Sequence, residues 1–401
     1  MKILVINCGS SSIKYKVFEM PEERLLVRGT LEKIGEESSI VKHQKGEETF
    51  ASTTLIRNHE QGLEIIARSL VDAARGVVRD VKEIEGVGHR VVHGGEGFDR
   101  SVVLSDDVIQ KIEDYRDLAP LHNPHNLSGI AASRKFFPLS VQVGSFDTAF
   151  HTTIPEVAHF YAIPSRFYEK YRIRRYGFHG TSHRYVARRA ADLLNRNKDE
   201  ANIITCHLGN GCSIAAVREG LSVDTSMGFT PLEGLMMGTR SGDIDPGVIF
   251  YLAERLGLDL KSINNLLNKE SGLLGISGVS NDFRNLLEAS SRGNKNAALA
   301  VEMFCYRVKK YIGAYMAVLG RVHAIVFTAG IGENNPVVRE KSLSGMEPLG
   351  VVFDKERNAA LTGKEGVVTG EKSPIAAFVI PTDEELRIAY DTYQAASGTA
   401  G

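Results

Sequence analysis

Two segments of the chain carry the same order of apolar and polar residues. Near the N-terminus, the apolar run Lys2–Ile6 leads into the polar turn Asn7–Ser12 before apolar residues resume. In the middle of the chain, Asn202–Cys206 leads into His207–Ser213 in the same way. Each segment is typical of a strand, a glycine-rich turn and a second strand. Small residues at such turns let backbone N–H groups approach a phosphate without an obstructing Cβ atom. The repeat therefore indicates two related halves that bind one phosphorylated ligand, which favours a nucleotide-dependent phosphotransferase.

Strands and helices alternate through the first third of the chain. Apolar runs predict strands over residues 25–31, 84–92 and 141–146. Apolar residues at helical spacing predict helices over Arg57–Ala74 and Asp106–Tyr115, the second with Ser105 as its N-cap.

The second half of the chain repeats this alternation. A helix is predicted from Gly180 to Leu194, with Thr181 or Ser182 as its N-cap. Further elements are expected in chain order: a helix over 297–319, a strand over 324–327, a glycine-rich turn followed by a helix, a strand over 374–380 and a last helix that begins near 381–385.

Length and alternation together predict an α/β protein with two domains. A chain of 401 residues is too long for one ordinary core, and alternating strands and helices favour the α/β class. No linker rich in proline, glycine or serine separates the halves. We place the boundary after Asp147, so that residues 1–147 plus a returning helix, 385–401, form one domain. Residues 148–384 then form the second, nucleotide-binding domain.

Composition excludes some partners and favours one compartment. The 48 lysines and arginines nearly balance 49 acidic residues, which argues against general binding of nucleic acid or a membrane surface. No signal-peptide layout and no run of about 18 apolar residues is present. The four cysteines show no metal-binding spacing and are interpreted as reduced thiols. A cytoplasmic protein is expected.

Several residues have the chemistry that an anion site needs, although each also has a structural explanation. The turn around Gly9 offers N–H groups and hydroxyls beside Lys14, and Asn7 could reach Mg²⁺, but a plain hairpin turn would look similar. Arg90 and Arg240 lie among glycines, as expected of guanidinium groups that bind carboxylate or phosphate. Structural salt bridges are the alternative for both arginines.

The remaining candidates are weaker when taken singly. No P-loop or Rossmann fingerprint is present, and the motif at Gly330 to Gly332 fits either a nucleotide or a plain strand-to-helix turn. His179 and His183 could bind zinc, but a helix start beside them favours an anion site. Asp147 ends a predicted strand, where open α/β sheets bind ligands. Glu384, at a helix start, could bind Mg²⁺ or act only on the helix dipole.

Read together, these segments resemble the acetate kinase family, within the superfamily of acetate and sugar kinases, heat-shock chaperones and actin. The resemblance covers essentially the whole chain, and residues 7–14 and 177–183 match its two most specific motifs. It implies a two-domain, actin-like ATPase (ribonuclease H-like) fold with a mixed sheet flanked by helices in each domain. It also implies a cytoplasmic homodimer.

The resemblance assigns roles to residues of this chain. Asn7 and Glu384 would bind Mg²⁺, which Mn²⁺ may replace. Arg90 would bind the acetate carboxylate, and His179 and Arg240 would stabilise the transferring phosphoryl group. Asp147 would be the catalytic aspartate, which positions Arg90 and the metal-bound water. ATP would be bound by Ser10, Ser12, Lys14, His207, Leu208, Gly209, Asn210, Gly211, Asp282, Phe283, Arg284, Gly330, Ile331, Gly332, Glu333 and Asn334. Val92, Leu121, Phe178 and Pro231 would surround the acetate methyl group.

The implied activity is reversible, in-line phosphoryl transfer from MgATP to acetate, giving acetyl phosphate and ADP. Within this class, a propionate or butyrate kinase is the alternative, because one methylene is worth only about 1–3 kcal/mol. From another class, an ATP-driven chaperone or filament protein is the competitor. Two positions depart from the family pattern: Cys8 stands where alanine is common, and Asp383 where asparagine is common.

Overall fold

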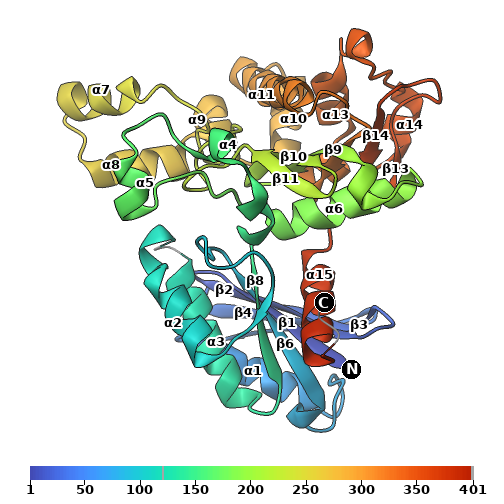
Figure 1. The fold of residues 1–401 in the computed structure, drawn as a ribbon. Coiled ribbons are helices and arrows are strands. Elements are labelled where there is room, and N and C mark those ends of the chain that lie inside the picture. The colour runs from blue at the N-terminus through green and yellow to red at the C-terminus, as the bar shows by residue number, and fades with distance from the viewer. Residues whose placement is uncertain (120–121, 399–401) are drawn as a thin grey trace. The chain divides into compact units, whose positions relative to one another are not determined.

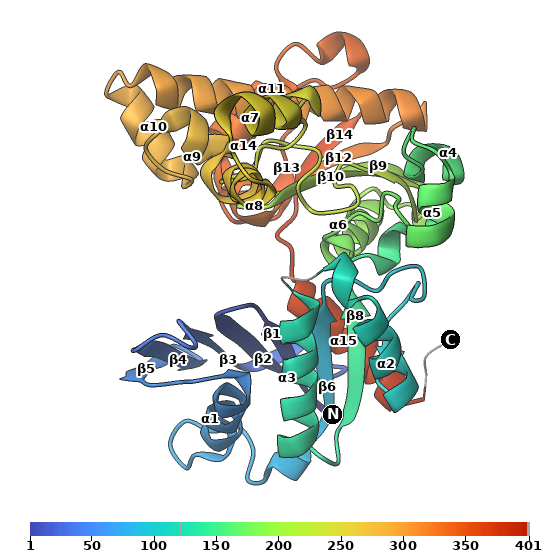
Figure 2. The same cartoon turned by 90° about the vertical axis from the view of Figure 1, so that its left-hand side faces the viewer.

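The computed structural model describes residues 1–119 and 122–398, apart from the side chain of Asp117. The chain divides into two compact units, which are described separately: unit 1 is Met1–Thr152 with Asp383–Gly401, and unit 2 is Thr153–Thr382. Each unit contains a mixed sheet with helices packed against it (Figures 1 and 2). The predicted α/β class with two mixed, helix-flanked sheets is therefore confirmed. The domain boundaries named from the sequence remain a prediction.

Unit 1 is built on an eight-stranded sheet with the order β5-β4-β3-β2-β1-β6-β8-β7. Its strands are β1 (Lys2–Cys8), β2 (Ser12–Glu19), β3 (Arg24–Glu32), β4 (Ser39–Lys45), β5 (Glu48–Thr54), β6 (Ile84–Val91), β7 (Val102–Val103) and β8 (Val141–Phe146). The first five strands form an antiparallel meander, whereas β1, β6 and β8 run parallel. The parallel strands end together at the edge that carries Arg90 and the residues after β8.

Helices cover both faces of the unit 1 sheet (Figure 1). They are α1 (His59–Val71), α2 (Asp106–Asp114), α3 (Asn123–Phe136) and α15 (Glu384–Ala396), with short 3₁₀ turns η1 (Val81–Glu83), η2 (Arg116–Leu118) and η3 (Ala149–Thr153). Apolar residues of β1, β2 and α1, such as Leu4, Ile13 and Leu63, form the main core. On the other face, Ile388 of α15 packs with Ile3 and Val5. Ser105 caps α2 as predicted, accepting from the N–H of Val108.

Unit 2 is built on a six-stranded sheet with the order β11-β10-β9-β12-β14-β13. Its strands are β9 (Asn202–Leu208), β10 (Cys212–Arg218), β11 (Leu221–Thr225), β12 (Ala324–Thr328), β13 (Gly366–Val367) and β14 (Ala376–Val379). Helices α6 (Gly180–Leu193) and α11 (Lys295–Leu319) pack against this sheet. The other helices are α4 (Glu156–His159), α5 (Arg166–Tyr171), α7 (Gly247–Leu256), α8 (Leu260–Asn265), α9 (Gly272–Ser277), α10 (Phe283–Ser291), α12 (Ala329–Asn334), α13 (Pro336–Leu343) and α14 (Lys355–Ala360), with short turns η4 (Lys198–Glu200), η5 (Leu266–Glu270) and η6 (Glu347–Leu349).

The two sheets share one five-stranded topology. Strands β3-β2-β1-β6-β8 of unit 1 correspond in order and direction to β11-β10-β9-β12-β14 of unit 2. In each unit the first two strands in the chain pair antiparallel, and the first strand pairs parallel with a later strand. The two similar hairpins seen in the sequence therefore occupy equivalent places, and their turns are the β1–β2 turn and the β9–β10 turn.

Two local predictions differ from the structure. The helix predicted to have Thr181 or Ser182 as its N-cap instead begins at Gly180, with His179 in the N-cap position. His179 has a left-handed backbone, with φ of 58°, and its ring is held by contacts from β9 and β10. A tertiary contact therefore overrides the local preference for a hydroxyl side chain at the cap. Strands β4 and β5 were not expected at all.

Candidate active site

The β1–β2 turn is held from two helices of unit 1. The N–H of Gly9 donates to the carbonyl of Ser12, 2.8 Å away, and closes the turn. The ring Nε2 of His59, on α1, donates to the carbonyl of Gly9 at 2.6 Å, and Asn126 of α3 donates to the carbonyl of Cys8 at 2.9 Å. Ser10 lies exposed on this turn. The turn is thus fixed by hydrogen bonds from α1 and α3.

Arg90, at the end of β6, forms a two-pronged ion pair. Its Nε and Nη2 donate to the two carboxylate oxygens of Asp147, at 3.0 and 2.7 Å, and Asp147 is only 2% exposed. Glu384 lies 3.8 Å from the same Nε. Burial alone would lower the pKa of Arg90, but the negative charges of Asp147 and Glu384 outweigh it and raise that pKa. The predicted pairing of Asp147 with Arg90 is present in the structure.

Glu384 is the acidic group whose environment could accept a cation. Burial, together with the charges of Asp147 and Glu385, raises the pKa of its carboxyl to about 7, although Arg90 and Lys14 act in the opposite direction. A bound divalent cation would offset this crowding of negative charge. Asn7 pairs with Lys14 in the hairpin register and supplies an amide oxygen, which is a ligand type that Mg²⁺ accepts.

The ligands offered by Asn7 and Glu384 fit Mg²⁺, which keeps water and phosphate oxygens as ligands, better than a metal ion bound entirely by protein side chains. Among the residues that the structure describes, no group of three or more histidine, cysteine, aspartate or glutamate side chains could hold a metal ion. This finding disfavours zinc at His179 and His183. Mg²⁺ commonly takes only one or two carboxylates, with water and phosphate oxygens as its other ligands. Asn7 and Glu384 therefore remain suitable ligands.

The unusual Asp383 has a structural role. Its Oδ1 accepts from the N–H of Leu386 and caps α15 at its N-terminus, at 3.0 Å. The same atom pairs with the ammonium group of Lys16 at 3.1 Å, and Lys16 also lies 3.2 Å from Glu385. The cap and the ion pair fix the helix start that presents Glu384.

In unit 2, the β9–β10 turn is where His179 and Arg240 converge. A Cβ atom built on Gly211 would lie 3.4 Å from Nη1 of Arg240 and 3.6 Å from Nε2 of His179. The carbonyl of Asn210 accepts from the N–H of Gly238 at 3.0 Å, which ties the turn to the loop that carries Arg240. Glycine at position 211 therefore leaves open the space that the side chains of Arg240 and His179 both face.

Arg240 has no acidic partner among the residues that the structure describes. Its Nη1 donates to the carbonyl of Pro231 at 3.1 Å and lies 3.8 Å from the sulfur of Met237. Within the described residues, no carboxylate lies within ion-pair distance of this guanidinium group. Burial accordingly lowers the pKa of Arg240. A partly buried guanidinium without a counter-charge is suited to binding an anionic ligand.

His179 is fixed by contacts on two sides. Its Nδ1 shares a hydrogen bond with the hydroxyl of Ser213 at 2.9 Å, and its ring stacks on His207 with centroids 4.2 Å apart. The Nδ1 of His207 in turn contacts the hydroxyl of Ser182 at 2.8 Å. Because non-glycine residues rarely adopt φ near 58°, a left-handed His179 that is held this firmly indicates a functional constraint.

A cavity of about 660 Å³ lies beside the β9–β10 turn in unit 2. Its walls combine that turn with the start of α10, with α12 and with the segment after α14. They include Gly209, Asn210, Asp282, Phe283, Arg284, Gly330, Ile331 and Asn334, all expected to bind ATP, and also Asn281, Asn335 and Thr362, which sequence reasoning missed. Its volume lies in the range of small-molecule sites.

Other residues predicted to bind ATP do not line this cavity. They are His207, Leu208, Gly211, Gly332 and Glu333 of unit 2, and Ser10, Ser12 and Lys14 of unit 1. Leu208 is fully buried in β9. One carboxylate oxygen of Glu333 accepts from the N–H groups of Ala329 and Thr382, at 2.7 and 3.0 Å. Glu333 therefore stabilises the start of α12 rather than presenting its carboxylate to the cavity.

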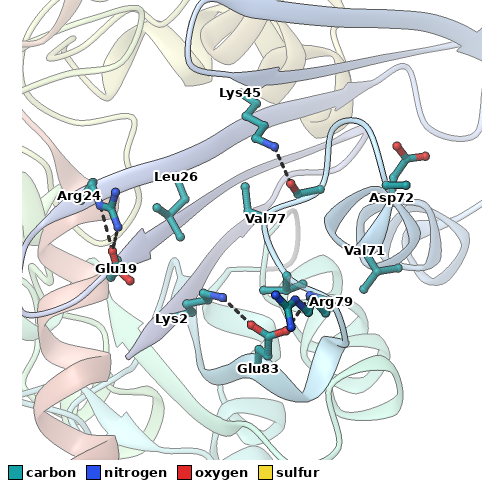
Figure 3. Close-up of a pocket in the computed structure, with 13 residues that line it drawn as sticks. Lys2, Glu19, Arg24, Leu26, Lys45, Val71, Asp72, Val77, Arg79 and Glu83 are labelled. Carbon is teal, nitrogen blue, oxygen red and sulfur yellow. Dashed lines mark hydrogen bonds and ion pairs between the residues drawn. The ribbon is translucent and has the colours of Figure 1, made fainter.

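A second cavity, of about 800 Å³, lies in unit 1 at the start of β1 (Figure 3). No residue that was predicted to bind substrate lines it. Its polar groups largely contact one another: Lys2 pairs with Glu83 at 2.6 Å, Arg24 pairs with Glu19, and Lys45 donates to the carbonyl of Gly76 at 2.9 Å (Figure 3). It is not the predicted site.

The predicted site residues fall into both units. Asn7, Lys14, Arg90, Asp147 and Glu384 belong to unit 1. Val92 of the same unit donates its backbone N–H to Oδ1 of Asn126. Phe178, which is 3% exposed, and Pro231 belong to unit 2 with His179 and Arg240. Leu121 lies outside the described residues.

No described helix is both long and apolar enough to cross a membrane.

Comparison with known proteins identifies the family. Residues 2–390 match the model of the acetokinase family. The acetate kinase of Caldanaerobacter subterraneus subsp. tengcongensis is 53% identical over 400 residues, covering 99% of this chain and all of that protein. The crystal structure of the acetate kinase of Porphyromonas gingivalis has a TM-score of 0.95 at 49% identity, covering 98% of this chain and 99% of its own. A propionate kinase structure from Francisella tularensis has a TM-score of 0.92 at 42% identity, covering 98% and 99%. The recognised resemblance and the two-domain fold are thus confirmed, and the chain belongs to the acetokinase family.

Proposed function

We propose that this protein transfers the γ-phosphoryl group of ATP reversibly to acetate, giving acetyl phosphate and ADP. The observation that carries the proposal is Arg240. This guanidinium is partly buried, has no carboxylate partner among the described residues, and faces the same glycine as His179. A cavity of about 660 Å³ adjoins that glycine-rich turn. Membership of the acetokinase family and full-length similarity to acetate kinases support the same activity.

The reaction joins two anions and needs no general base. Acetate is already ionised at neutral pH, so an acetate oxygen attacks the γ-phosphorus directly. The new O–P bond forms as the bond between the γ-phosphorus and the bridging oxygen breaks, and ADP leaves with that oxygen. In this in-line transfer, the attacking oxygen and the leaving oxygen lie on opposite sides of the phosphorus. Arg240 and Nε2 of His179 bind the equatorial oxygens and offset their charge.

Unit 1 supplies the groups for acetate and metal. Arg90, oriented by Asp147, binds the acetate carboxylate through its remaining N–H donors. Asn7 and Glu384 hold Mg²⁺, or Mn²⁺, which neutralises phosphate charge when it is bound. The exposed Lys14 and the hydroxyls of the β1–β2 turn, from Ser10 and Ser12, bind phosphate oxygens.

Unit 2 supplies the nucleotide pocket. Residues 207–211, which comprise the end of β9 and the β9–β10 turn, bind phosphates through their backbone N–H groups. The adenosine part occupies the cavity between Asp282–Arg284 and Gly330–Asn334, with Asn281, Asn335 and Thr362 as additional contacts. Gly332 and Glu333 stabilise the pocket without lining it, because the Glu333 carboxylate accepts hydrogen bonds from backbone N–H groups of unit 2.

Propionate is the second candidate substrate, because one of the similar solved structures is a propionate kinase. By the family resemblance, the residues that would contact the alkyl group of the acid are Val92, Phe178 and Pro231, together with Leu121, which lies outside the described residues. An apolar pocket discriminates against one methylene by only about 1–3 kcal/mol. Measurable turnover of propionate is therefore part of the proposal, with acetate preferred.

We further propose a cytoplasmic homodimer. Helix α7 has no buried residue, and the neighbouring apolar side chains Val248, Phe250, Tyr251, Leu256 and Leu260 are 43% to 77% exposed. Apolar groups gathered in this way are typical of protein–protein interfaces. The four cysteines are buried and unpaired, which suits a reducing compartment. Sedimentation of wild-type protein and of a Phe250→Glu, Tyr251→Glu variant tests the dimer, and an unchanged mass would contradict this interface.

Trapping of the acyl phosphate with hydroxylamine tests the activity. Wild-type protein with MgATP should form acyl hydroxamate with acetate, less with propionate and least with butyrate, in terms of kcat/KM. ATP hydrolysis that does not depend on any short-chain acid would contradict the proposal and favour an ATP-driven binding switch. A higher kcat/KM for propionate would reassign the substrate.

A further inference from the structure

Three buried polar side chains behind His179 form one hydrogen-bonded row. Nδ1 of His179 and Nε2 of His183 both contact the hydroxyl oxygen of Ser213, at 2.9 and 2.7 Å. Nδ1 of His183 contacts the hydroxyl of Thr205 at 2.7 Å. Ser213, His183 and Thr205 are all completely buried. The row links α6, β9 and β10 and ends at the ring that faces Gly211 and Arg240.

The hydrogen count of this row allows only a few arrangements. A serine hydroxyl has one hydrogen, and a neutral imidazole has one N–H. A buried hydroxyl without an acceptor is costly. The hydroxyl of Ser213 therefore donates its hydrogen to one of its two neighbouring ring nitrogens, Nδ1 of His179 or Nε2 of His183. If it goes to His179, the hydrogen of His179 lies on Nε2. If it goes to His183, the hydrogen of His179 lies on Nδ1, and Nε2 carries a proton only when the ring is a cation.

If Nε2 of His179 donates to the phosphoryl group, as the proposed function requires, the neighbourhood of Arg240 decides between these directions. A Cβ atom on Gly211 would lie within 3.4 Å of Nη1 of Arg240 and 3.6 Å of Nε2 of His179, so both groups face one small space. A second full positive charge beside a partly desolvated guanidinium is unfavourable. A neutral ring with its hydrogen on Nε2 can donate to a phosphoryl oxygen without that repulsion. Neutral imidazoles serve as hydrogen-bond donors to developing charge in other enzymes.

We propose that Ser213 and His183 are positioning residues that hold His179 neutral, with Nε2–H directed at the transferring phosphoryl group. Thr205 donates to Nδ1 of His183, His183 donates from Nε2 to Ser213, and Ser213 donates to Nδ1 of His179. This row also holds the ring in place against the left-handed backbone at His179. The inference rests on the proposed phosphoryl transfer and assigns a role to His183, which the function has not otherwise used.

The kinetic test uses Ser213→Ala with a matched control. Loss of the hydroxyl should lower kcat on the order of 10-fold, with the KM values for ATP and acetate changed less than about 3-fold, because the lost bond acts in the transition state. Ser133→Ala removes an equally buried serine hydroxyl that bonds to Gln142 in unit 1, and it should retain wild-type kcat. Equal losses of kcat in the two variants would overturn the proposal.

A double-mutant cycle separates positioning from a general structural effect. Ser213→Ala should cost nothing further in a His179→Gln background, because Ser213 acts only through that ring. Additive losses would contradict the proposal, since Ser213 would then act independently of His179.

Nuclear magnetic resonance of ¹⁵N-histidine protein tests the tautomer directly, without any need for activity. Comparison with the His179→Gln spectrum identifies the signals of His179. At pH 7.5 the proposal requires a neutral ring protonated at Nε2. A ring protonated at Nδ1, or at both nitrogens, overturns it. If wild-type protein formed no acyl phosphate, the proposed function would fail, whereas this spectrum would still decide the hydrogen position.

Discussion

Arg90 and Arg240 show how one side chain is prepared for different work in two regions of the molecule. Arg90 is bound by both oxygens of Asp147 and lies close to Glu384, so negative charge surrounds it. Within the described part of the chain, the hydrogen-bond partners of Arg240 are the Pro231 carbonyl and the Met237 sulfur. The pKa of Arg90 is raised by its neighbours, whereas that of Arg240 is lowered by burial.

The difference indicates which anion each arginine can take. A compensated guanidinium is geometrically fixed and offers its remaining donors to a singly charged carboxylate. An uncompensated guanidinium gains more from each incoming charge, about 4 kcal/mol for unit charges 4 Å apart at an effective dielectric constant of 20. The two regions therefore suit an acceptor and a transferring phosphoryl group, respectively.

The largest expected effect comes from removing the uncompensated charge. Arg240→Ala should lower kcat on the order of 10³-fold, because the arginine neutralises charge that is concentrated in the transition state. The hydroxylamine assay measures it. Arg240→Lys keeps the positive charge but loses the planar guanidinium fork. Its kcat should therefore lie between those of the wild type and of Arg240→Ala. A normal kcat with only a raised KM in Arg240→Ala would contradict the different roles assigned to Arg240 and Arg90.

The compensated pair should matter first for stability. Asp147→Asn leaves Arg90 partly buried without its main counter-charge and should lower the free energy of unfolding by about 3 kcal/mol. Denaturant titration measures this change. The exposed pair of Arg100 and Asp99 offers a control, since Asp99→Asn should change stability little. If the two variants were equally stable, Asp147 would not be the partner that fixes Arg90.

Metal dependence should distinguish the regions again. Glu384→Gln should raise the Mg²⁺ concentration for half-maximal activity by at least about 10-fold, because the site loses its carboxylate ligand. Ser213→Ala, in the other region, should leave the Mg²⁺ requirement unchanged. A requirement that moved equally in both variants would show that Glu384 has no special relation to the metal.

At neutral pH the smallest expected effect comes from His89, because its contribution changes only on the acid side of the stability profile. Burial lowers the pKa of His89, the neighbour of Arg90, to about 4. The unfolded chain binds a proton near pH 6.5, whereas the folded protein does not until about pH 4. Stability should therefore fall as the pH drops from 6.5 towards 4, and His89 should contribute about 1.4 kcal/mol per pH unit. His89→Gln should show a shallower slope, and an identical slope would contradict a buried neutral His89.

Much of the framework is predictable because apolar runs and turn residues act locally. Strand β8 was predicted with its observed bounds, and α2 with its cap, since both follow period and capping rules. Strands β4 and β5 were not predicted, because their sequences lack the alternation of apolar and polar residues. In β4 the buried positions include the polar residues Ser39 and His43, and β5 is an exposed edge strand. Burial of polar side chains depends on tertiary contacts that one sequence does not reveal.

Site prediction was limited in the same way. Arg90, Asp147 and Arg240 could be singled out from glycines and strand ends. By contrast, Asn281, Asn335 and Thr362 meet at one cavity only because α10, α12 and the segment after α14 fold together. Ser213 likewise has no sequence signal that it would bridge two histidines. The sequence shows which groups have the right chemistry, whereas distance decides which of them act together.

A crystal structure with ADP, Mg²⁺, acetate and a planar fluoride mimic of the phosphoryl group would test the central claim most directly. The account predicts that Nη1 of Arg240 and Nε2 of His179 both donate to the mimic, while Arg90 remains paired with Asp147 and contacts the acetate. A mimic bound without either Arg240 or His179, or bound by Arg90 after it leaves Asp147, would contradict the account.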